Sequence, residues 1–217
     1  MPPSPRPAAS LRVMELRDIP AVVRLHAADL PHGFFVELGE RFLARYYRTF
    51  LTSPAGVALV AEVDGELAGF LVGSTDAATH HRHVIRLDRW QLARAGAVSL
   101  LVRPKLTARF VRTRIQRYAR GIRRASDDGR PGTAQRKRQG MLSHIAVDET
   151  KRRSGVGSKL VATFVEVARA HGVEHVQLQT APDNGAAQDF YANLGWKRQD
   201  AVHDGDDRAW VPFVLEL

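Results

Sequence analysis

Apolar residues in the amino-terminal part of the chain follow two spacings, one helical and one strand-like. Residues 14–30 place Ile19, Val22 and Val23 on one side of a predicted helix that ends before Pro31. A second helix is predicted over 38–51, where aromatic and aliphatic residues fall on one face. Two apolar runs, 57–63 and 67–72, flank an Asp-Gly dipeptide, which is a strong signal for a tight hairpin turn.

The carboxy-terminal part repeats these patterns in a different order. An apolar run over 142–147 predicts a strand, and helical spacing follows from 156 to 168. Residues 173–180 alternate apolar and polar side chains, which is typical of a strand with one buried face. Residues 186–194 return to helical spacing, Gly195 is a helix stop, and Trp196 opens another short strand.

A glycine-containing turn joins the strand at 142–147 to the helix that follows it. The turn reads Arg152-Arg153-Ser154-Gly155-Val156-Gly157. A turn of this kind directs backbone N–H groups and the positive end of a helix toward one point, where anions and above all pyrophosphate bind. Glycine suits these positions because a side chain would keep phosphate groups away from the backbone.

Two signatures in this region resemble those of the GCN5-related N-acetyltransferase (GNAT) family. The family's pyrophosphate signature, Gln/Arg-x-x-Gly-x-Gly/Ala, stands here as Arg152, Gly155 and Gly157. A second signature, Asn-x-x-Ala-x-x-Phe-Tyr-x-x-x-Gly-Phe/Trp, follows at the expected distance as Asn184, Ala187, Phe190, Tyr191, Gly195 and Trp196. The close match covers roughly residues 140–198, and a looser one covers 10–75.

The resemblance implies an α/β fold built around a mixed, mostly antiparallel sheet. The sheet of this family splays between its fourth and fifth strands and is flanked by helices. We expect a flexible tail over 1–10 and a single acyltransferase domain over 11–217. A basic helical insert and linker over 76–140 would then separate the third strand from the fourth.

The resemblance also implies an N-acyltransferase that uses acetyl-CoA, or another acyl-CoA, as co-substrate and a small-molecule or protein amine as acceptor. The amine would attack the thioester directly, without a covalent enzyme intermediate. The expected cofactor-binding residues are the end of the fourth strand, the glycine turn and the start of the last helix: Ile145, Ala146, Val147, Arg152, Arg153, Ser154, Gly155, Val156, Gly157, Ser158, Asn184, Ala187 and Tyr191.

Catalytic roles fall on three residues. Tyr191 matches the family's general acid, since a phenol is protonated at neutral pH and can donate to a departing thiolate; the alternative is a core aromatic beside Phe190. His144 and Ser143 are candidates for the general base, and His144 has the better titration range. Glu37 and His32, in or near the acceptor loop, are the alternatives for this role. The loop between the first two helices would border the acceptor and supply His32, Phe34, Phe35 and Glu37.

The net positive charge of the protein comes from the insert. Residues 80–140 hold 17 Arg and Lys against three acids, a net charge of +14, which leaves −5 for the rest because the whole chain carries +9. Residues 90–102 and 105–124 read as helices, the second with an arginine face. Three interpretations stay open for residues 80–138: packing on the core or on a second copy, binding of tRNA or another anionic surface, and association with a membrane surface.

Composition narrows the remaining alternatives. The chain has no cysteine, so disulfides and cysteine-based metal sites are excluded, and we expect no metal even at the cluster His80, His81 and His83. No signal peptide or transmembrane segment is visible in the sequence, so a cytoplasmic protein is expected, with homodimerisation left open. Two rival functions remain: a tRNA-dependent enzyme that uses aminoacyl-tRNA as donor or acceptor, and a non-catalytic acyl-CoA-binding module.

Overall fold

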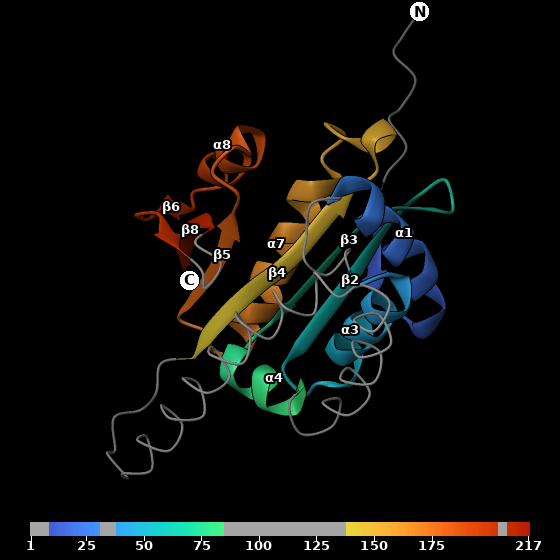
Figure 1. The fold of residues 1–217 in the computed structure, drawn as a ribbon, viewed down its shortest axis with the longest axis horizontal. Coiled ribbons are helices and arrows are strands. Elements are labelled where there is room, and N and C mark those ends of the chain that lie inside the picture. The colour runs from blue at the N-terminus through green and yellow to red at the C-terminus, as the bar shows by residue number, and fades with distance from the viewer. Residues whose placement is uncertain (1–8, 31–37, 85–137, 204–207) are drawn as a thin grey trace, which may run out of the picture.

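A single sheet runs through the protein, and helices cover both of its faces (Figure 1). The computed structural model describes residues 9–30, 38–84, 138–203 and 208–217. The strands are β1 (Ser10–Val13), β2 (Gly56–Val63), β3 (Glu66–Ser74), β4 (Gln139–Val147), β5 (His175–Thr180), β6 (Lys197–Arg198), β7 (Val202–His203) and β8 (Ala209–Glu216). The helices are α1 (Ile19–Asp29), α3 (Glu40–Thr52), α4 (Ala77–His83), α7 (Val156–Ala170) and α8 (Gly185–Asn193), with short 3-10 turns η1 (Leu16–Asp18) and η3 (Glu149–Lys151).

The strands lie in the order β1-β2-β3-β4-β5-β8-β6, and β7 pairs with β8. Neighbouring strands are antiparallel except β4 and β5, which are parallel. The β4–β5 pairing spans only Gln139 to Met141 on β4 and His175 to Gln177 on β5. Beyond this short contact the two strands diverge, and β5 takes all its further pairing from β8.

Alternation along the strands divides the interior into two cores. On β2, Val57, Leu59 and Ala61 face α7, whereas Ala58 and Val60 face α1 and α3. Figure 1 shows α7 behind the sheet and α1 and α3 in front of it. The strand residues are thus apolar on both faces, as expected for strands buried between two helical layers.

A β-bulge interrupts the pairing of β3 with β4 at the place where β5 joins the sheet. The register shifts between Val72 and Gly73, so that Ser143 has no partner position on β3. A side chain at Gly73 would meet the carbonyl of Met141 at 2.5 Å and the ring of Phe164 at 2.7 Å. Gly73 therefore lets the α7 core pack directly against the bulged strand.

The amino-terminal helix begins later than its apolar spacing predicts. The predicted element over 14–30 is α1 preceded by η1, and residues 10–13 form the edge strand β1, so that Ser10, the last residue of the predicted tail, belongs to the sheet. Asp18 accounts for the start, since its carboxylate accepts hydrogen bonds from the backbone of Glu15 at 2.7 Å and from the Arg12 guanidinium at 2.6 and 2.8 Å. Arg12 also bonds Glu62, which ties β1, β2 and the helix start together.

The other predicted elements appear close to their expected positions. Helices over 38–51, 156–168 and 186–194 are α3, α7 and α8, and the strands over 57–63, 67–72, 142–147 and 173–180 are β2, β3, β4 and β5. Strands β7 and β8 have no counterpart among the predictions. The helices predicted at 90–102 and 105–124, and most of the insert at 76–140, lie outside the described residues, whereas residues 139 and 140 belong to β4.

A histidine buried in the core makes the fold sensitive to acid. Burial lowers the pKa of His26, which is 2% exposed, to about 4 from an ordinary value of 6.5. Between these pH values the unfolded chain binds a proton that the folded protein does not, so folding stability is complete above about pH 6.5 and falls as the pH drops toward 4. The loss from this one group is on the order of 3 kcal/mol.

We therefore expect urea unfolding to give a clearly lower free energy at pH 4.5 than at pH 7. His26→Gln should reduce this difference, whatever its effect on stability at pH 7. The exposed His171 offers a control, and His171→Gln should leave the acid sensitivity unchanged. An unaltered pH dependence in His26→Gln would show that His26 is not the group responsible.

Candidate functional site

The gap between β4 and β5 exposes a length of strand backbone. The Asp148 N–H donates to the Ala68 carbonyl at 2.9 Å, which sets the alternation along the β3–β4 ladder. Ala146 and His144 share the phase of Asp148 and direct their backbone groups toward β3. Ile145 and Val147 have the opposite phase, so their N–H and C=O groups point into the gap, where no described strand pairs with them.

Ile145, Ala146 and Val147 were all expected to line the cofactor, but the alternation turns them in two different directions. Ile145 and Val147 present backbone donors and acceptors along the gap. Ala146 turns its backbone to Phe70 on β3, and its side chain lies in the core beneath α1 and α3. The gap can thus hydrogen-bond an extended, amide-bearing chain through alternate residues, in the manner of an added strand.

The turn after β4 brings the start of α7 to the same end of the gap. Asp148 caps η3 by accepting from the Thr150 N–H at 2.9 Å, and Ser154 Oγ donates to the Lys151 carbonyl at 2.5 Å. Arg153 and Gly155 both have positive φ, +61° and +87°, which reverses the chain into the helix.

The first turn of α7 therefore presents backbone N–H groups without intrahelical partners, those of Val156, Gly157 and Ser158. A Cβ at Gly155 would have no heavy atom within 4 Å, so the space beside this residue is open to a ligand. At Gly157 a Cβ would contact the Phe190 ring at 3.4 Å and Val147 at 3.7 Å, so this glycine faces α8 and the end of β4. The open space and the helix start fit a pyrophosphate group.

Arg152 makes contacts that its place in the signature does not predict. Its guanidinium forms an ion pair with Asp29, the last residue of α1, and its Nε donates to the Val147 carbonyl at 3.3 Å. Arg152 therefore joins the glycine turn to α1 across the end of β4. The neighbouring Arg153 and Lys159 are exposed, so they are placed to meet an anion from solvent.

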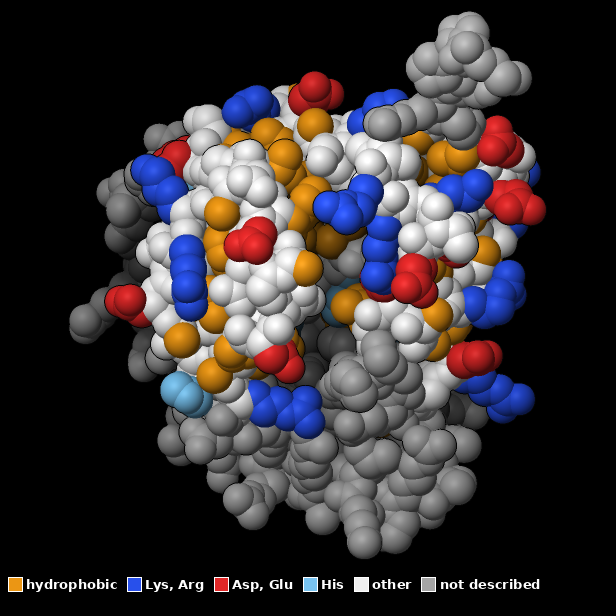
Figure 2. Space-filling model, turned by 90° about the horizontal axis from the view of Figure 1, so that it is seen from above, with side chains coloured by type: hydrophobic (Ala, Val, Ile, Leu, Met, Phe, Trp, Pro, Cys, Tyr) orange, Lys and Arg blue, Asp and Glu red, His pale blue; other side chains and the backbone are white. Residues whose placement is uncertain are grey.

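A space-filling view shows a hollow between the part of the protein that holds α8 and the part that holds α1 (Figure 2). Lys and Arg side chains stand along its rim, and a histidine side chain is visible inside it. The diverging β4 and β5 run beneath this opening (Figure 1). The hollow thus combines an open strand edge, a helix start and positive charge.

The α8 residues take positions around the far wall of the gap. Asn184 is the cap of α8, and its Oδ1 accepts from the Ala187 N–H at 3.0 Å, so both residues are engaged with each other. Tyr191 is 4% exposed and contacts the rings of Phe190, Trp196 and Phe213. Burial raises its pKa, which keeps the phenol protonated throughout the physiological range. Tyr191 is thus a core aromatic residue whose hydroxyl stays protonated at neutral pH.

His144 and Ser143 lie at the bulge where the gap begins. His144 projects toward α1 and α3, where its ring meets those of His26, Tyr46 and Tyr47 with centroids 5.1, 5.5 and 6.3 Å apart. Desolvation, helped by His26, lowers the pKa of His144 to about 3. This histidine is neutral at neutral pH and does not titrate in the range that motivates its choice as a base.

Tyr46, Tyr47 and Asp29 make polar contacts that sequence patterns do not reveal. Tyr46 Oη lies 3.1 Å from His144 Nε2, and His26 Nδ1 lies 2.5 Å from Tyr47 Oη. Asp29 holds Arg152. In the sequence the two tyrosines belong to the apolar face of a helix, and nothing in the spacing pairs them with histidines far away along the chain. The expected acceptor residues His32, Phe34, Phe35 and Glu37 lie outside the described residues.

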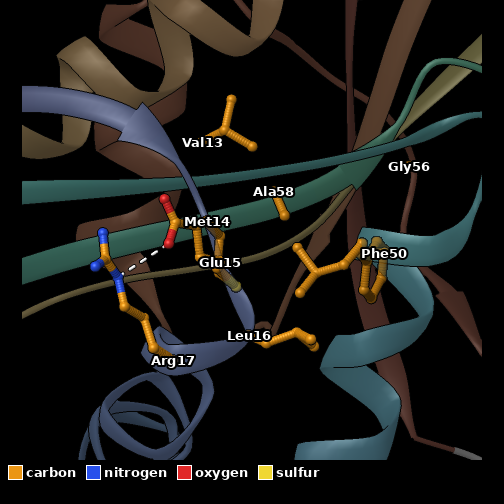
Figure 3. A pocket seen from close by; sticks show the side chains of 9 residues that line it. Val13, Met14, Glu15, Leu16, Arg17, Phe50, Gly56 and Ala58 are labelled. Atoms are coloured by element: carbon orange, nitrogen blue, oxygen red, sulfur yellow. Dashed lines mark ion pairs between the residues drawn. The ribbon is translucent and has the colours of Figure 1, made fainter.

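A separate depression lies at the other edge of the sheet (Figure 3). It measures about 510 Å³ and is lined by β1, η1, the end of α3 and the start of β2, with Glu15 and Arg17 paired at 3.0 Å at its side. Its described lining holds the start of the short 3-10 turn η1 and the edge strand β1, but no glycine turn that leads into a long α-helix as at Gly155. We therefore place the candidate site at the β4–β5 gap and not here.

Within the described part of the chain, no three or more His, Asp or Glu side chains gather as a metal site would require. None of the described helices is both long and apolar enough to cross a bilayer.

Comparisons with known proteins show related sequences and a shared fold. The sequence profile of the acetyltransferase (GNAT) family matches residues 113–196. N-alpha-acetyltransferase 30 of Schizosaccharomyces pombe is 32% identical over 60 residues, and GCN5-related N-acetyltransferase 6, chloroplastic, of Arabidopsis thaliana is 33% identical over 60 residues. Each alignment covers 28% of this chain but only 40% and 21% of these relatives, so the chain spans less than half of their length.

Solved structures extend the likeness to the whole fold. Ard1 from Thermoplasma volcanium superposes with a TM-score of 0.58 at 19% identity, covering 97% of this chain and 98% of that one. The ribosomal-protein-S18-alanine N-acetyltransferase from Escherichia coli gives 0.56 at 14% identity, covering 96% and 94%. At these identities the likeness concerns the fold alone. It confirms the predicted α/β architecture, with helices around a mixed sheet that splays at β4 and β5.

The two ends of α7 offer a matched test of the anion site. Gly155 and Gly172 both have positive φ, +87° and +66°, and at both a Cβ would meet nothing within 4 Å. Alanine at either position should cost about 1 kcal/mol of stability through backbone strain. Gly155→Ala should also weaken CoA binding at least tenfold in calorimetry, because the new methyl group enters the open space beside the helix start. Gly172→Ala should bind CoA as the wild type does, and equal affinities for the two variants would contradict this site.

Proposed function

We propose that the chain is a member of the acetyltransferase (GNAT) family and that it transfers an acyl group, acetyl by default, from acyl-CoA to a primary amine. One observation carries the proposal. The backbone of Ile145 and Val147 and the start of α7 face the same gap. This arrangement suits a donor that has amide groups in its arm and a pyrophosphate at the end of it.

Different residues of the gap would bind different parts of the acyl-CoA donor. The pyrophosphate would lie against the N–H groups of Val156, Gly157 and Ser158, with Arg153 and Lys159 nearby. The pantetheine amides would pair with the free edge of β4. A β4 N–H directed into the gap, that of Ile145 or Val147, would polarise the thioester carbonyl as an oxyanion-hole donor does.

Tyr191 would protonate the departing thiolate. Its burial keeps the phenol protonated, so its proton is available at the moment the carbon–sulfur bond breaks. Asn184 and Ala187 would support this step indirectly, because their mutual hydrogen bond fixes the start of α8, the helix that carries Tyr191. The amine must be neutral when it attacks, so a base must remove a proton from it. This base would lie on the side of the sheet opposite Tyr191.

The acceptor class is the part of the proposal that the relatives inform least. The S. pombe protein is named as an N-alpha-acetyltransferase, and the E. coli protein is named for acetylation of an alanine of a ribosomal protein. The S. pombe match covers only 60 residues, and the likeness to the E. coli protein concerns the fold. We therefore include both peptide and small-molecule amines in the test. The expected loop residues His32, Phe34, Phe35 and Glu37 are candidates for contacts with the amine.

The test measures release of free thiol from acetyl-CoA in the presence of single amines. Suitable probes are short peptides with free amino termini, a polyamine and an amino sugar. The wild-type protein should acetylate at least one probe, as confirmed by mass spectrometry of the product. Tyr191→Phe keeps the ring contacts and should lower kcat by roughly 100-fold with little change in CoA affinity.

Two results would overturn different parts of this proposal. Tight acetyl-CoA binding without thiol release for any probe would favour the acyl-CoA-binding module. Full activity in Tyr191→Phe would remove Tyr191 from the mechanism while leaving the transferase in place. Thermal unfolding of the variant alongside the wild type controls for loss of structure.

A tRNA-dependent reaction is the second candidate, and the net charge of +14 on residues 80–140 is the observation that favours it. Binding through arginine–phosphate contacts weakens steeply with salt. Fluorescence anisotropy with an aminoacyl-tRNA should then show salt-dependent binding by the full-length protein. Replacing Arg109, Arg112, Arg120 and Arg123 with Gln should abolish it while CoA binding survives. Absence of tRNA binding near physiological salt would eliminate this candidate.

A further inference from the structure

Two tyrosine–histidine pairs lie side by side beneath the gap. Adjacent residues of α3, Tyr46 and Tyr47, each contact a different histidine: Tyr46 Oη is 3.1 Å from Nε2 of His144 on β4, and Tyr47 Oη is 2.5 Å from Nδ1 of His26 on α1. The rings of the two histidines meet edge-to-face at 5.1 Å. Three elements that are separate in sequence thus contribute to one polar cluster.

The two pairs have the same chemistry but different access. Tyr47 and His26 are 0% and 2% exposed, so their hydrogen bond is sealed inside the core. Tyr46 and His144 are only partly buried, and His144 belongs to the stretch of β4 that borders the gap. Only the second pair is therefore placed to exchange a proton with a ligand.

We propose that Tyr46 and His144 form the proton relay that deprotonates the acceptor amine, an inference that rests on the proposed acyltransferase function. His144 Nε2 already faces the Tyr46 hydroxyl, so a proton from the amine reaches this nitrogen through that hydroxyl. A tyrosine hydroxyl can accept one hydrogen bond while donating another, which is what a relay group requires. Tyr46 then touches the amine, and His144 stores the proton.

The step balances without any further reactant. The amine nitrogen forms a bond to the thioester carbonyl carbon, and the carbon–sulfur bond breaks. An N–H proton of the amine moves to Tyr46 Oη as the hydroxyl proton moves to His144 Nε2. The thiolate takes a proton from Tyr191. His144 then releases its proton to solvent, and a proton from solvent restores the Tyr191 hydroxyl. The products are an amide and a free thiol.

The surroundings of His144 keep its ring neutral before the reaction. The described titratable groups that face it are His26 from α1 and Tyr46 and Tyr47 from α3. Burial keeps His26 neutral above about pH 4 and raises the pKa of Tyr47. His144 is also neutral before the reaction, so its ring can accept a proton. The same low basicity makes it release the proton readily after the amide has formed.

The two pairs supply their own matched variants. Tyr46→Phe and Tyr47→Phe each remove one hydroxyl and keep the aromatic ring in place. Tyr46→Phe should lower kcat by roughly 100-fold for the best amine probe, with the KM for acetyl-CoA unchanged. Tyr47→Phe should lower the unfolding midpoint and leave kcat within about twofold of the wild type. His144→Gln should resemble Tyr46→Phe, and the double variant should lose little more, because both residues act in one step.

Nitrogen NMR gives a readout that does not depend on turnover. Two-bond ¹H–¹⁵N spectra of protein labelled at histidine report which ring nitrogen carries the proton. Tyr46→Phe should shift the Nε2 signal of His144 and spare His26, and Tyr47→Phe should shift the Nδ1 signal of His26 and spare His144. An unmoved His144 signal in Tyr46→Phe would overturn the pairing on which the relay depends.

The outcomes separate this inference from the proposed function. Wild-type kcat in Tyr46→Phe would overturn the relay while the acyltransferase stands. A tenfold loss of kcat in both tyrosine variants would also overturn it, because it would assign the effect to packing. Binding of acetyl-CoA without turnover of any amine by the wild-type protein would overturn the proposed function and the relay together.

Discussion

The candidate site depends on backbone donors in β4 that the sheet leaves without a partner strand. A buried N–H that loses its partner costs about 1–3 kcal/mol, so a strand edge inside a protein stays open only where the surrounding structure holds the neighbouring strand away. Here β3 secures one side of β4, and β8 secures the far side of β5. Phe190 of α8 lies against Gly157 and supports the separation on the α7 side. Packing on both sides of the gap thus keeps β4 and β5 apart.

The end of the gap is joined to the rest of the protein by a small number of directed contacts. Gly155 turns the chain into α7 with a left-handed backbone, and Arg152 ties this turn to Asp29 at the end of α1. The helix that would hold the donor and the helix that precedes the expected acceptor loop are therefore linked by one ion pair. The residues that follow α1, from 31 to 37, include the candidates for contact with the amine.

The core between the sheet and α1 and α3 serves two purposes at once. Apolar packing around Tyr47 and His26 stabilises the fold, and it also removes water from the histidines and keeps them neutral. Desolvation lowers the basicity of His144, but a weak base can still receive a proton that the attacking amine has become acidic enough to lose. The cost of burying these histidines is the sensitivity of the folded state to acid.

Much of the fold could be predicted from local sequence alone. Apolar spacing placed three helices and the β2–β5 strands within a few residues, because each signal lies within one element. The glycine turn into α7 was also predictable, since Gly155 and the helix that follows it are adjacent in sequence. The start of α1 was not, because Asp18 is held by Arg12 and Glu15 through contacts that apolar spacing does not encode.

The chemistry beneath the gap was decided by tertiary structure. The sequence singled out His144 for its ordinary titration range, whereas burial lowers its pKa far below that range. It also grouped Tyr46 with the apolar face of a helix, and only the packing of α3 on β4 brings its hydroxyl to a histidine 98 positions away. Local patterns determine which elements form, because helices and strands are short-range structures. Proton affinity and hydrogen-bond partners depend on what surrounds a side chain in space, and here α1, α3 and β4 together supply those surroundings.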